Sequence, residues 1–372
     1  MSERPFRFIH RDIVILLALC VIAVLGFLVT RDAAASNEEI FLADAAAWYE
    51  TGLEALDAGR TAEAVEALRR AAFINDENRA YRLALARALA ADGQDDLARG
   101  ELLALRTLTP EDPEVNLELA RVEARGADLD AAVRYYENAL YGVWPEARAE
   151  DRSRLRVELI RYLLGRGQGS TALAEILALA GNMPATVAWE IEAADLFMAV
   201  GDAGRALDGY TRALATDPDD GRALAGAGRA AFALDDFVQA RRFLAEAPDD
   251  LGGVAELREV ADLVLSRDPL AARLSAEQRR QRLLGNVIRA EERLAACADD
   301  VAVSAALALA QKALADFRPV LAPAAFRESA DAVETGVTLV ARVQSAADRV
   351  CEAPTPADRA LTIIGRLHAD AS

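Results

Sequence analysis

A set of small and apolar residues recurs every 34 residues from Ala45 onwards, and this period restricts the fold more than any other feature. In the first copy, Trp48, Gly52 and Ala55 have helical spacing, and a second helical pattern follows a break at Gly59. The next two copies carry Ala86, Gly93, Ala98, Leu102, Leu105 and Pro110, then Leu119, Ala120, Ala132, Tyr136, Ala139 and Pro145. A period of this length predicts a pair of helices that stacks on copies of itself.

The period resumes after an interruption at residues 142–152, which shifts its phase by six residues. The later copies carry Leu159, Gly167, Ala172, Ile176, Leu179 and Pro184, then Ala194, Gly201, Ala206, Tyr210, Ala213 and Pro218, then Gly228, Ala240, Leu244 and Ala247. This pattern resembles the tetratricopeptide repeat (TPR) family, with about six repeats between residues 45 and 250. The resemblance implies a solenoid of helical hairpins that presents a groove to protein partners.

The predicted fold is all-α, with a TPR-type solenoid between a transmembrane helix and a small helical bundle. The expected segments are a cytoplasmic N-terminus (1–12), a transmembrane helix (13–30), a tether (31–44), a first block of three repeats (45–144), an insertion (145–152), a second block of three repeats (153–250), a capping helix (251–268) and a C-terminal helical bundle (269–372). The last segment resembles no family.

Residues 13–30 contain no charge and would span about 27 Å as a helix, close to the thickness of a bilayer core. Arg4, Arg7 and Arg11 precede this run and only Arg31 follows it closely. This asymmetry predicts a single-pass protein of a bacterial inner membrane with its N-terminus in the cytoplasm and its bulk in the periplasm. The alternative is a soluble periplasmic protein, after cleavage of a signal peptide near residues 33–35.

Charge and composition argue against several classes of function. The net charge of −18 and the absence of a basic tail argue against nucleic-acid binding. The chain has two histidines, His10 and His368, at its opposite ends. Because no phosphate-binding glycine loop and no nucleophile motif is present either, we expect no catalytic residues, no metal and no cofactor.

Arginines recur at one position of the repeats. In the TPR family the ninth residue of each first helix faces the groove, and four of the six such residues here are Arg87, Arg121, Arg161 and Arg229. Arg125, Arg154 and Arg222 lie close to them in sequence. A guanidinium can bind a carboxylate through two hydrogen bonds, so these arginines predict a site for an acidic segment or a C-terminal carboxylate of a partner. The alternative is that each arginine pairs with an acidic residue of a neighbouring helix.

The resemblance does not extend to the chaperone-binding TPR proteins, which hold a C-terminal carboxylate with lysine and asparagine. The only lysine here is Lys312, outside the repeats. An aromatic group at the insertion, with Tyr141 and Trp144 as its exposed candidates, offers a second possible contact with a partner. Packing between the two repeat blocks is the alternative role for these rings.

Cys297 and Cys351 are the only cysteines outside the apolar run, and each lies at the C-terminal end of a predicted long helix. In an up-down-up bundle, these two ends lie together. We therefore predict a disulfide between them, with two buried, reduced thiols as the alternative.

Together these features predict a membrane-anchored scaffold for protein–protein interaction, not an enzyme. The alternatives are a structural subunit of a larger membrane complex and, more weakly, an enzyme with a site in the C-terminal bundle.

Overall fold

The computed structural model describes residues 4–126, 128–144, 148–298, 305–329, 331–349, 351 and 353–369. The chain divides into two compact units, residues 1–162 and 163–372. In the described residues every regular element is helical, in line with the all-α prediction. Residues 1–3 of the expected N-terminal segment and residues 145–147 of the expected insertion lie outside the described part.

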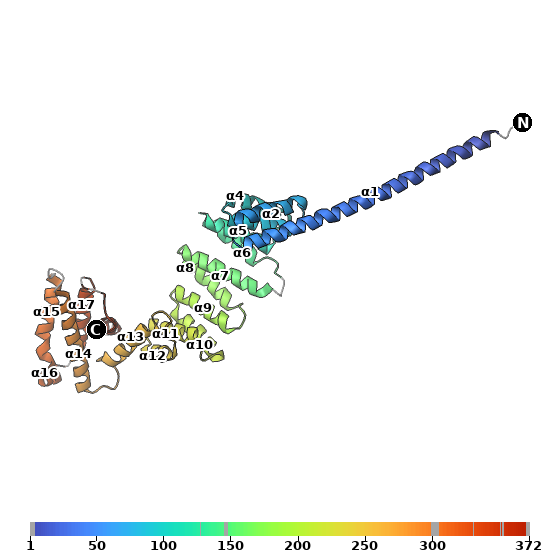
Figure 1. The fold of residues 1–372 in the computed structure, drawn as a ribbon. Coiled ribbons are helices and arrows are strands. Elements are labelled where there is room, and N and C mark those ends of the chain that lie inside the picture. The colour runs from blue at the N-terminus through green and yellow to red at the C-terminus, as the bar shows by residue number, and fades with distance from the viewer. Residues whose placement is uncertain are drawn as a thin grey trace. The chain divides into compact units, whose positions relative to one another are not determined.

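The first unit consists of antiparallel helical hairpins that begin at the C-terminal part of a long first helix (Figure 1). Its helices are α1 (Arg4–Asp57), α2 (Thr61–Ile74), α3 (Arg79–Ala91), α4 (Asp95–Leu108), α5 (Pro113–Arg125), α6 (Leu129–Leu140) and α7 (Ala149–Gly165), the last of which crosses the unit boundary. Gly59 and Gly93 have φ angles of 73° and 79°, a left-handed conformation that glycine adopts without strain. These two glycines therefore end α1 and α3 at the predicted breaks.

The small residues of the repeat allow the helices of a hairpin to lie very close together. A Cβ atom on Gly52 would lie 2.4 Å from Cγ of Leu68, a fully buried residue of α2. Likewise, a Cβ atom on Gly228 of α11 (Gly221–Ala233) would lie 2.5 Å from Cγ of Leu244 of α12 (Phe237–Glu246). The recurrence of this contact in both units explains why glycine occupies that position of the repeat.

The second unit continues the hairpins and ends in a bundle. The hairpin helices are α8 (Gly169–Ala180), α9 (Val187–Ala199), α10 (Ala203–Thr216), α11 and α12. After α13 (Val254–Arg267), the bundle contains α14 (Ala276–Ala298), α15 (Ala305–Phe317), the 3-10 helix η2 (Arg318–Leu321), α16 (Pro323–Glu328), α17 (Ala332–Ala347) and α18 (Pro356–Leu367). One apolar core joins Phe237 and Val260 to the bundle residues, so α13 packs on the bundle as well as on α12.

The N-terminal predictions require correction. Within the described residues, no helix combines the length and the apolar character needed to cross a membrane. The apolar residues 13–30 instead form part of the 54-residue helix α1, which continues through Arg31, Glu38 and Glu39 into the first hairpin. The predicted transmembrane helix and the predicted single-pass inner-membrane location are therefore wrong. The expected tether, residues 31–44, is also helical.

Candidate functional site

The first unit carries a surface of arginines and carboxylates along α3, α5 and α7. We call it the charged surface and define it by Arg79, Arg87, Asp112, Glu114, Glu118, Arg121, Arg148, Asp151, Arg154 and Glu158. Arg87 and Arg121 lie 34 residues apart, on the first helices of successive hairpins. The repeat period therefore places these two arginines on corresponding faces of α3 and α5.

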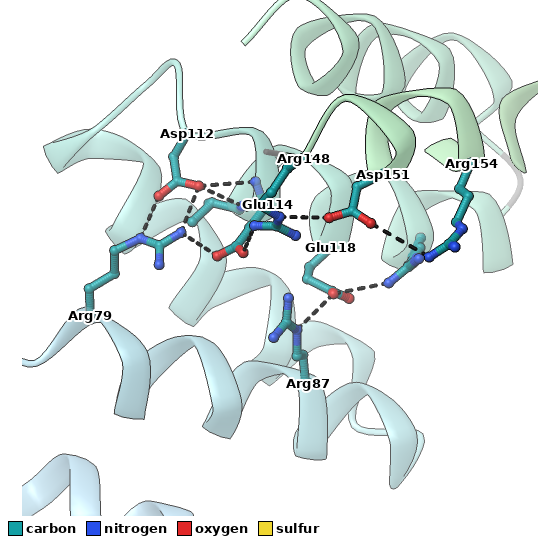
Figure 2. Close-up of polar contacts among 10 residues, drawn as sticks. Arg79, Arg87, Asp112, Glu114, Glu118, Arg148, Asp151 and Arg154 are labelled. Atoms are coloured by element: carbon teal, nitrogen blue, oxygen red, sulfur yellow. Dashed lines mark hydrogen bonds and ion pairs between the residues drawn. The ribbon is translucent and has the colours of Figure 1, made fainter. Parts of the chain in front are cut away.

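Two acidic residues at the start of α5 connect arginines from different parts of the unit (Figure 2). Asp112 accepts hydrogen bonds from the backbone N–H groups of Glu114 and Val115, and so caps α5. The same carboxylate accepts from Nη2 of Arg79 at 2.7 Å. Glu114 lies between two guanidiniums, with Nη2 of Arg79 at 2.8 Å and Nη1 of Arg148 at 2.6 Å. These contacts hold Arg148, the residue directly before α7, against the start of α5.

A second group lies along the middle of the same helices. Nε of Arg87 donates to Glu118 at 2.8 Å, and Nη1 of Arg121 donates to the same carboxylate at 3.1 Å. Arg121 also reaches Glu158 of α7 at 2.7 Å, where the hydroxyl of Tyr136 donates at 2.9 Å. The group therefore ties α3, α5, α6 and α7 together through charge-assisted hydrogen bonds.

The pKa values of these carboxyl groups reflect their partners. Burial by itself would raise the pKa of Glu114, but hydrogen bonds from Arg79 and Arg148 outweigh it and hold that pKa below its usual range. For Glu158 the opposing effects are again burial and the hydrogen bonds from Arg121 and Tyr136, and the pKa is lowered. Burial beside the negative charge of Glu158 raises the pKa of Tyr136. These carboxylates are therefore ionised, and Tyr136 neutral, at neutral pH.

The predicted groove arginines of the first unit have different surroundings. Arg87 and Arg121 belong to the charged surface, and Arg154 pairs with Glu150 of its own helix at 2.7 Å. Arg125 points to α4, where its Nε lies 3.1 Å from Oδ1 of Asp95. Arg161 is exposed on α7. Pairing with a neighbouring helix, the alternative considered for these arginines, is thus observed for Arg87, Arg121 and Arg125.

The remaining two predicted groove arginines, Arg222 and Arg229, lie on α11 of the second unit. Arg222 pairs with Asp195 of α9 at 3.2 Å, and Nε of Arg229 donates to the carbonyl of Ala225 at 3.2 Å. The hydroxyl of Tyr210 donates to the same Asp195. The seven arginines are therefore divided between the units.

Arg79 and Arg148 were not among the predicted site residues, although both hold Glu114. Arg148 lies in the segment that interrupts the period, so its register could not be read from the repeat. Arg79 is the first residue of α3, directly after the capping residue Asn78. The sequence signal for Arg79 was a helix-capping residue followed directly by a positively charged residue. The corresponding helix one repeat later begins with acidic residues, which such a charge can bind.

The aromatic group at the end of α6 separates into packed and exposed rings. The indole N–H of Trp144 donates to the carbonyl of Ala139 at 2.8 Å, and the guanidinium of Arg148 lies 5.3 Å from its ring centre. Tyr136 is buried, whereas Tyr141 is 74% exposed. Tyr141 is thus the ring of this group most accessible to a partner.

Cys297 and Cys351 are bonded in the structure, with a Cα–Cα distance of 5.2 Å. One turn before Cys297, the buried Arg293 donates to Asp348, which lies shortly before Cys351. No group of three or more histidine, cysteine, aspartate or glutamate side chains suited to a metal occurs in the described part of the chain.

Comparison with known proteins identifies the repeat. Residues 197–261, from the end of α9 to α13, match a family model described as tetratricopeptide repeat. No curated protein matches the chain. The TPR family is therefore supported by residues 197–261.

Several solved structures are similar in fold. YrrB, described as a TPR protein with an unusual peptide-binding site, is 17% identical over 52% of this chain and 99% of its own, with a TM-score of 0.41. PilF of Pseudomonas aeruginosa is 19% identical over 55% of this chain and 90% of its own, also with a TM-score of 0.41. PilW, described as a type IV pilus biogenesis factor, is 16% identical over 54% and 91%, with a TM-score of 0.40. Similarity at this level concerns the helical-hairpin fold alone.

Proposed function

We propose that this chain, whose residues 197–261 match the tetratricopeptide repeat, is a scaffold for protein–protein interaction, and that its charged surface binds an acidic segment of a partner. The binding of an acidic segment is inferred from a difference in exposure between the arginines and the carboxylates of the charged surface. Asp112, Glu114 and Glu118 are less exposed than the arginines that pair with them, so these guanidiniums are the more accessible charges.

The side-chain exposures make this difference clear. Arg79 is 43% exposed and its partner Asp112 is 8% exposed. Arg87 and Arg121 are 42% and 41% exposed, and Glu118, which they share, is 9% exposed. The buried carboxylates orient the arginines and reduce their freedom, so less side-chain entropy is lost when a ligand binds.

The arginines also retain unused donors. A guanidinium has five N–H groups, and among the described residues Arg87 donates only through Nε, to Glu118. Its two Nη groups can still bind a carboxylate side by side. The charged surface contains as many acidic residues as arginines, so its net charge is small. We therefore expect this binding to depend on the geometry of the guanidinium hydrogen bonds more than on long-range electrostatic attraction.

The direct test measures the binding of labelled peptides to the full chain by fluorescence anisotropy. The probes are a peptide of alternating glutamate and alanine with a free C-terminus, the same peptide with an amidated C-terminus, and a lysine–alanine counterpart. We expect the glutamate peptide to bind, more weakly at high salt, and the lysine peptide not to bind. Loss of binding on amidation would assign the contact to the C-terminal carboxylate, a narrower form of the same proposal.

The variant Arg87→Gln/Arg148→Gln tests the location of binding. It leaves no carboxylate without a cation, because Glu118 keeps Arg121 and Glu114 keeps Arg79. We expect it to weaken glutamate-peptide binding by about tenfold at an almost unchanged thermal midpoint. Arg69→Gln, at an exposed position of α2 in the same unit, is the matched control and should bind as before. Equal binding by the double variant and the control would contradict the proposed surface.

A further inference from the structure

A hollow of about 510 Å³ lies in the second unit between α17 and the C-terminal end of α18. Its lining consists of Thr338, Ala341, Arg342, Ser345, Ala346, Arg349, Gly365 and Ala369. The volume is within the range of small-molecule sites, about 300–1,000 Å³. The hollow shares no residue with the charged surface, so a ligand bound there is independent of the proposed function.

Small residues at the helix crossing create this hollow. A Cβ atom on Gly365 would lie 2.2 Å from Cβ of Ala341, so α18 packs against α17 with no room for a side chain at residue 365. Ala346 and Ala369 continue the small side chains along the lining. No large side chain therefore fills the space, and the longer side chains of α17 form its wall.

Those longer side chains form one polar stripe. Thr338, Arg342, Ser345 and Arg349 follow one another at intervals of four, three and four residues, which places them on one face of α17 and the turn after it. Two hydroxyls thus alternate with two guanidiniums, all four exposed. All of them can donate hydrogen bonds, and a guanidinium can only donate.

Neither Arg342 nor Arg349 forms an ion pair or side-chain hydrogen bond with another described residue. Two described charges nearby have partners elsewhere: Asp348 accepts from Arg293 at 2.7 Å, and Arg366 of α18 pairs with Asp235. The described residues of the lining include no aspartate or glutamate. In a chain of net charge −18, two arginines that face one hollow without an acidic partner among the described residues are therefore a local exception.

We propose that this hollow binds a small anion with two acidic groups, phosphate or carboxylate. Each guanidinium binds one acidic group through a pair of N–H donors, and the hydroxyls of Thr338 and Ser345 donate to further oxygens of the ligand. The Cα atoms of Arg342 and Arg349 are separated by about 10 Å along the helix, and both side chains are long enough to converge on one ligand.

The test is isothermal titration calorimetry of the full chain with inorganic pyrophosphate as the probe, and with citrate in a second arm. We expect saturable binding of one molecule per chain to at least one probe. The probe that binds more tightly assigns the acidic group as phosphate or carboxylate. Orthophosphate, with a single acidic group, should bind at least tenfold more weakly than pyrophosphate if phosphate is the group recognised.

The variant Arg342→Gln/Arg349→Gln should weaken this binding by at least tenfold, and Ser345→Ala by a smaller factor. Arg69→Gln, an exposed position of the first unit, is the control and should bind like the unsubstituted chain. The thermal midpoint of each variant verifies folding, and Ser345→Ala keeps the test decisive if the double variant is unstable. Absence of binding to both probes, or undiminished binding in the variants, would overturn the proposal.

Discussion

At the scale of single residues, glycines of the repeat decide how closely the two helices of a hairpin approach. Gly52 faces the fully buried Leu68, and Gly228 faces Leu244 in the same way. Gly100 on α4 has the opposite environment, because nothing lies within 4 Å of the position of its Cβ. Glycine in a helix normally lowers stability relative to alanine, so packing against Leu68, and not helix propensity, explains glycine at position 52.

We expect Gly52→Ala to lower the free energy of unfolding by about 1–3 kcal/mol, because the added methyl group displaces Leu68 from a filled core. Gly100→Ala should raise the same quantity by about 0.5–1 kcal/mol through helix propensity alone. Chemical denaturation of both variants measures the difference. A stabilised Gly52→Ala protein would show that α1 and α2 have room to separate.

At the scale of elements, the bundle is held by a polar cluster and a covalent bond at one end. Arg289 of α14 donates to both carboxylate oxygens of Asp358 at 3.0 Å, and Asp358 also completes a capping box with Thr355 at the start of α18. Cys297 and Cys351 join the end of α14 to the turn after α17. The short helix α16 precedes α17, and the side chains of Ser329 and Asp331 bond to each other between the two helices.

The disulfide remains a prediction about the isolated protein. It closes a loop of 54 residues, for which chain entropy gives a stabilisation of about 4 kcal/mol. Reduction should therefore lower the midpoint of urea unfolding of the second unit. Mass spectrometry after non-reducing digestion should find the Cys297–Cys351 peptide pair, and Cys20→Ser should leave that pair unchanged. Free thiols at both positions would contradict the prediction.

At the scale of the whole molecule, acidic side chains stabilised by arginines occur in both units. The pKa values of Asp112 and Glu158 in the first unit and Asp358 in the second lie below their usual range, since hydrogen bonds, chiefly from Arg79, Arg121 and Arg289, outweigh the effect of burial. A carboxyl group whose pKa is lower in the folded state stabilises that state above its unfolded pKa, about 4. This stabilisation is lost as the pH falls through the folded pKa.

We therefore expect the thermal midpoint to be nearly constant from about pH 7 to pH 5 and to fall steeply below about pH 4. Asp112→Asn should have a lower midpoint at pH 7 but lose less of it between pH 5 and pH 3, because asparagine still caps α5 without titrating. Glu54→Gln, at an exposed position of α1, is the control and should follow the unsubstituted chain. Parallel curves for Asp112→Asn and the unsubstituted chain would contradict the role of Asp112.

Much of the architecture could be predicted from the sequence. The 34-residue period placed the hairpins, and the left-handed glycines Gly59 and Gly93 end their helices as the pattern indicated. These features depend on local spacing and on backbone conformation, both of which a single sequence displays. The relation of Arg87 to Arg121 is available for the same reason, because one repeat separates them.

Tertiary structure alone decided the partners of these residues. The period places Arg121 on a helix face, but only the packing of α5 against α7 brings Glu158 to it. Arg148 lies outside the period, and the hollow beside Arg342 depends on the close crossing at Gly365. The apolar run at 13–30 was wrongly interpreted because its local hydropathy does not reveal that the helix continues to Asp57. Local pattern determines helices and their faces, whereas contacts distant in sequence determine which charges are paired and which stay available to a ligand.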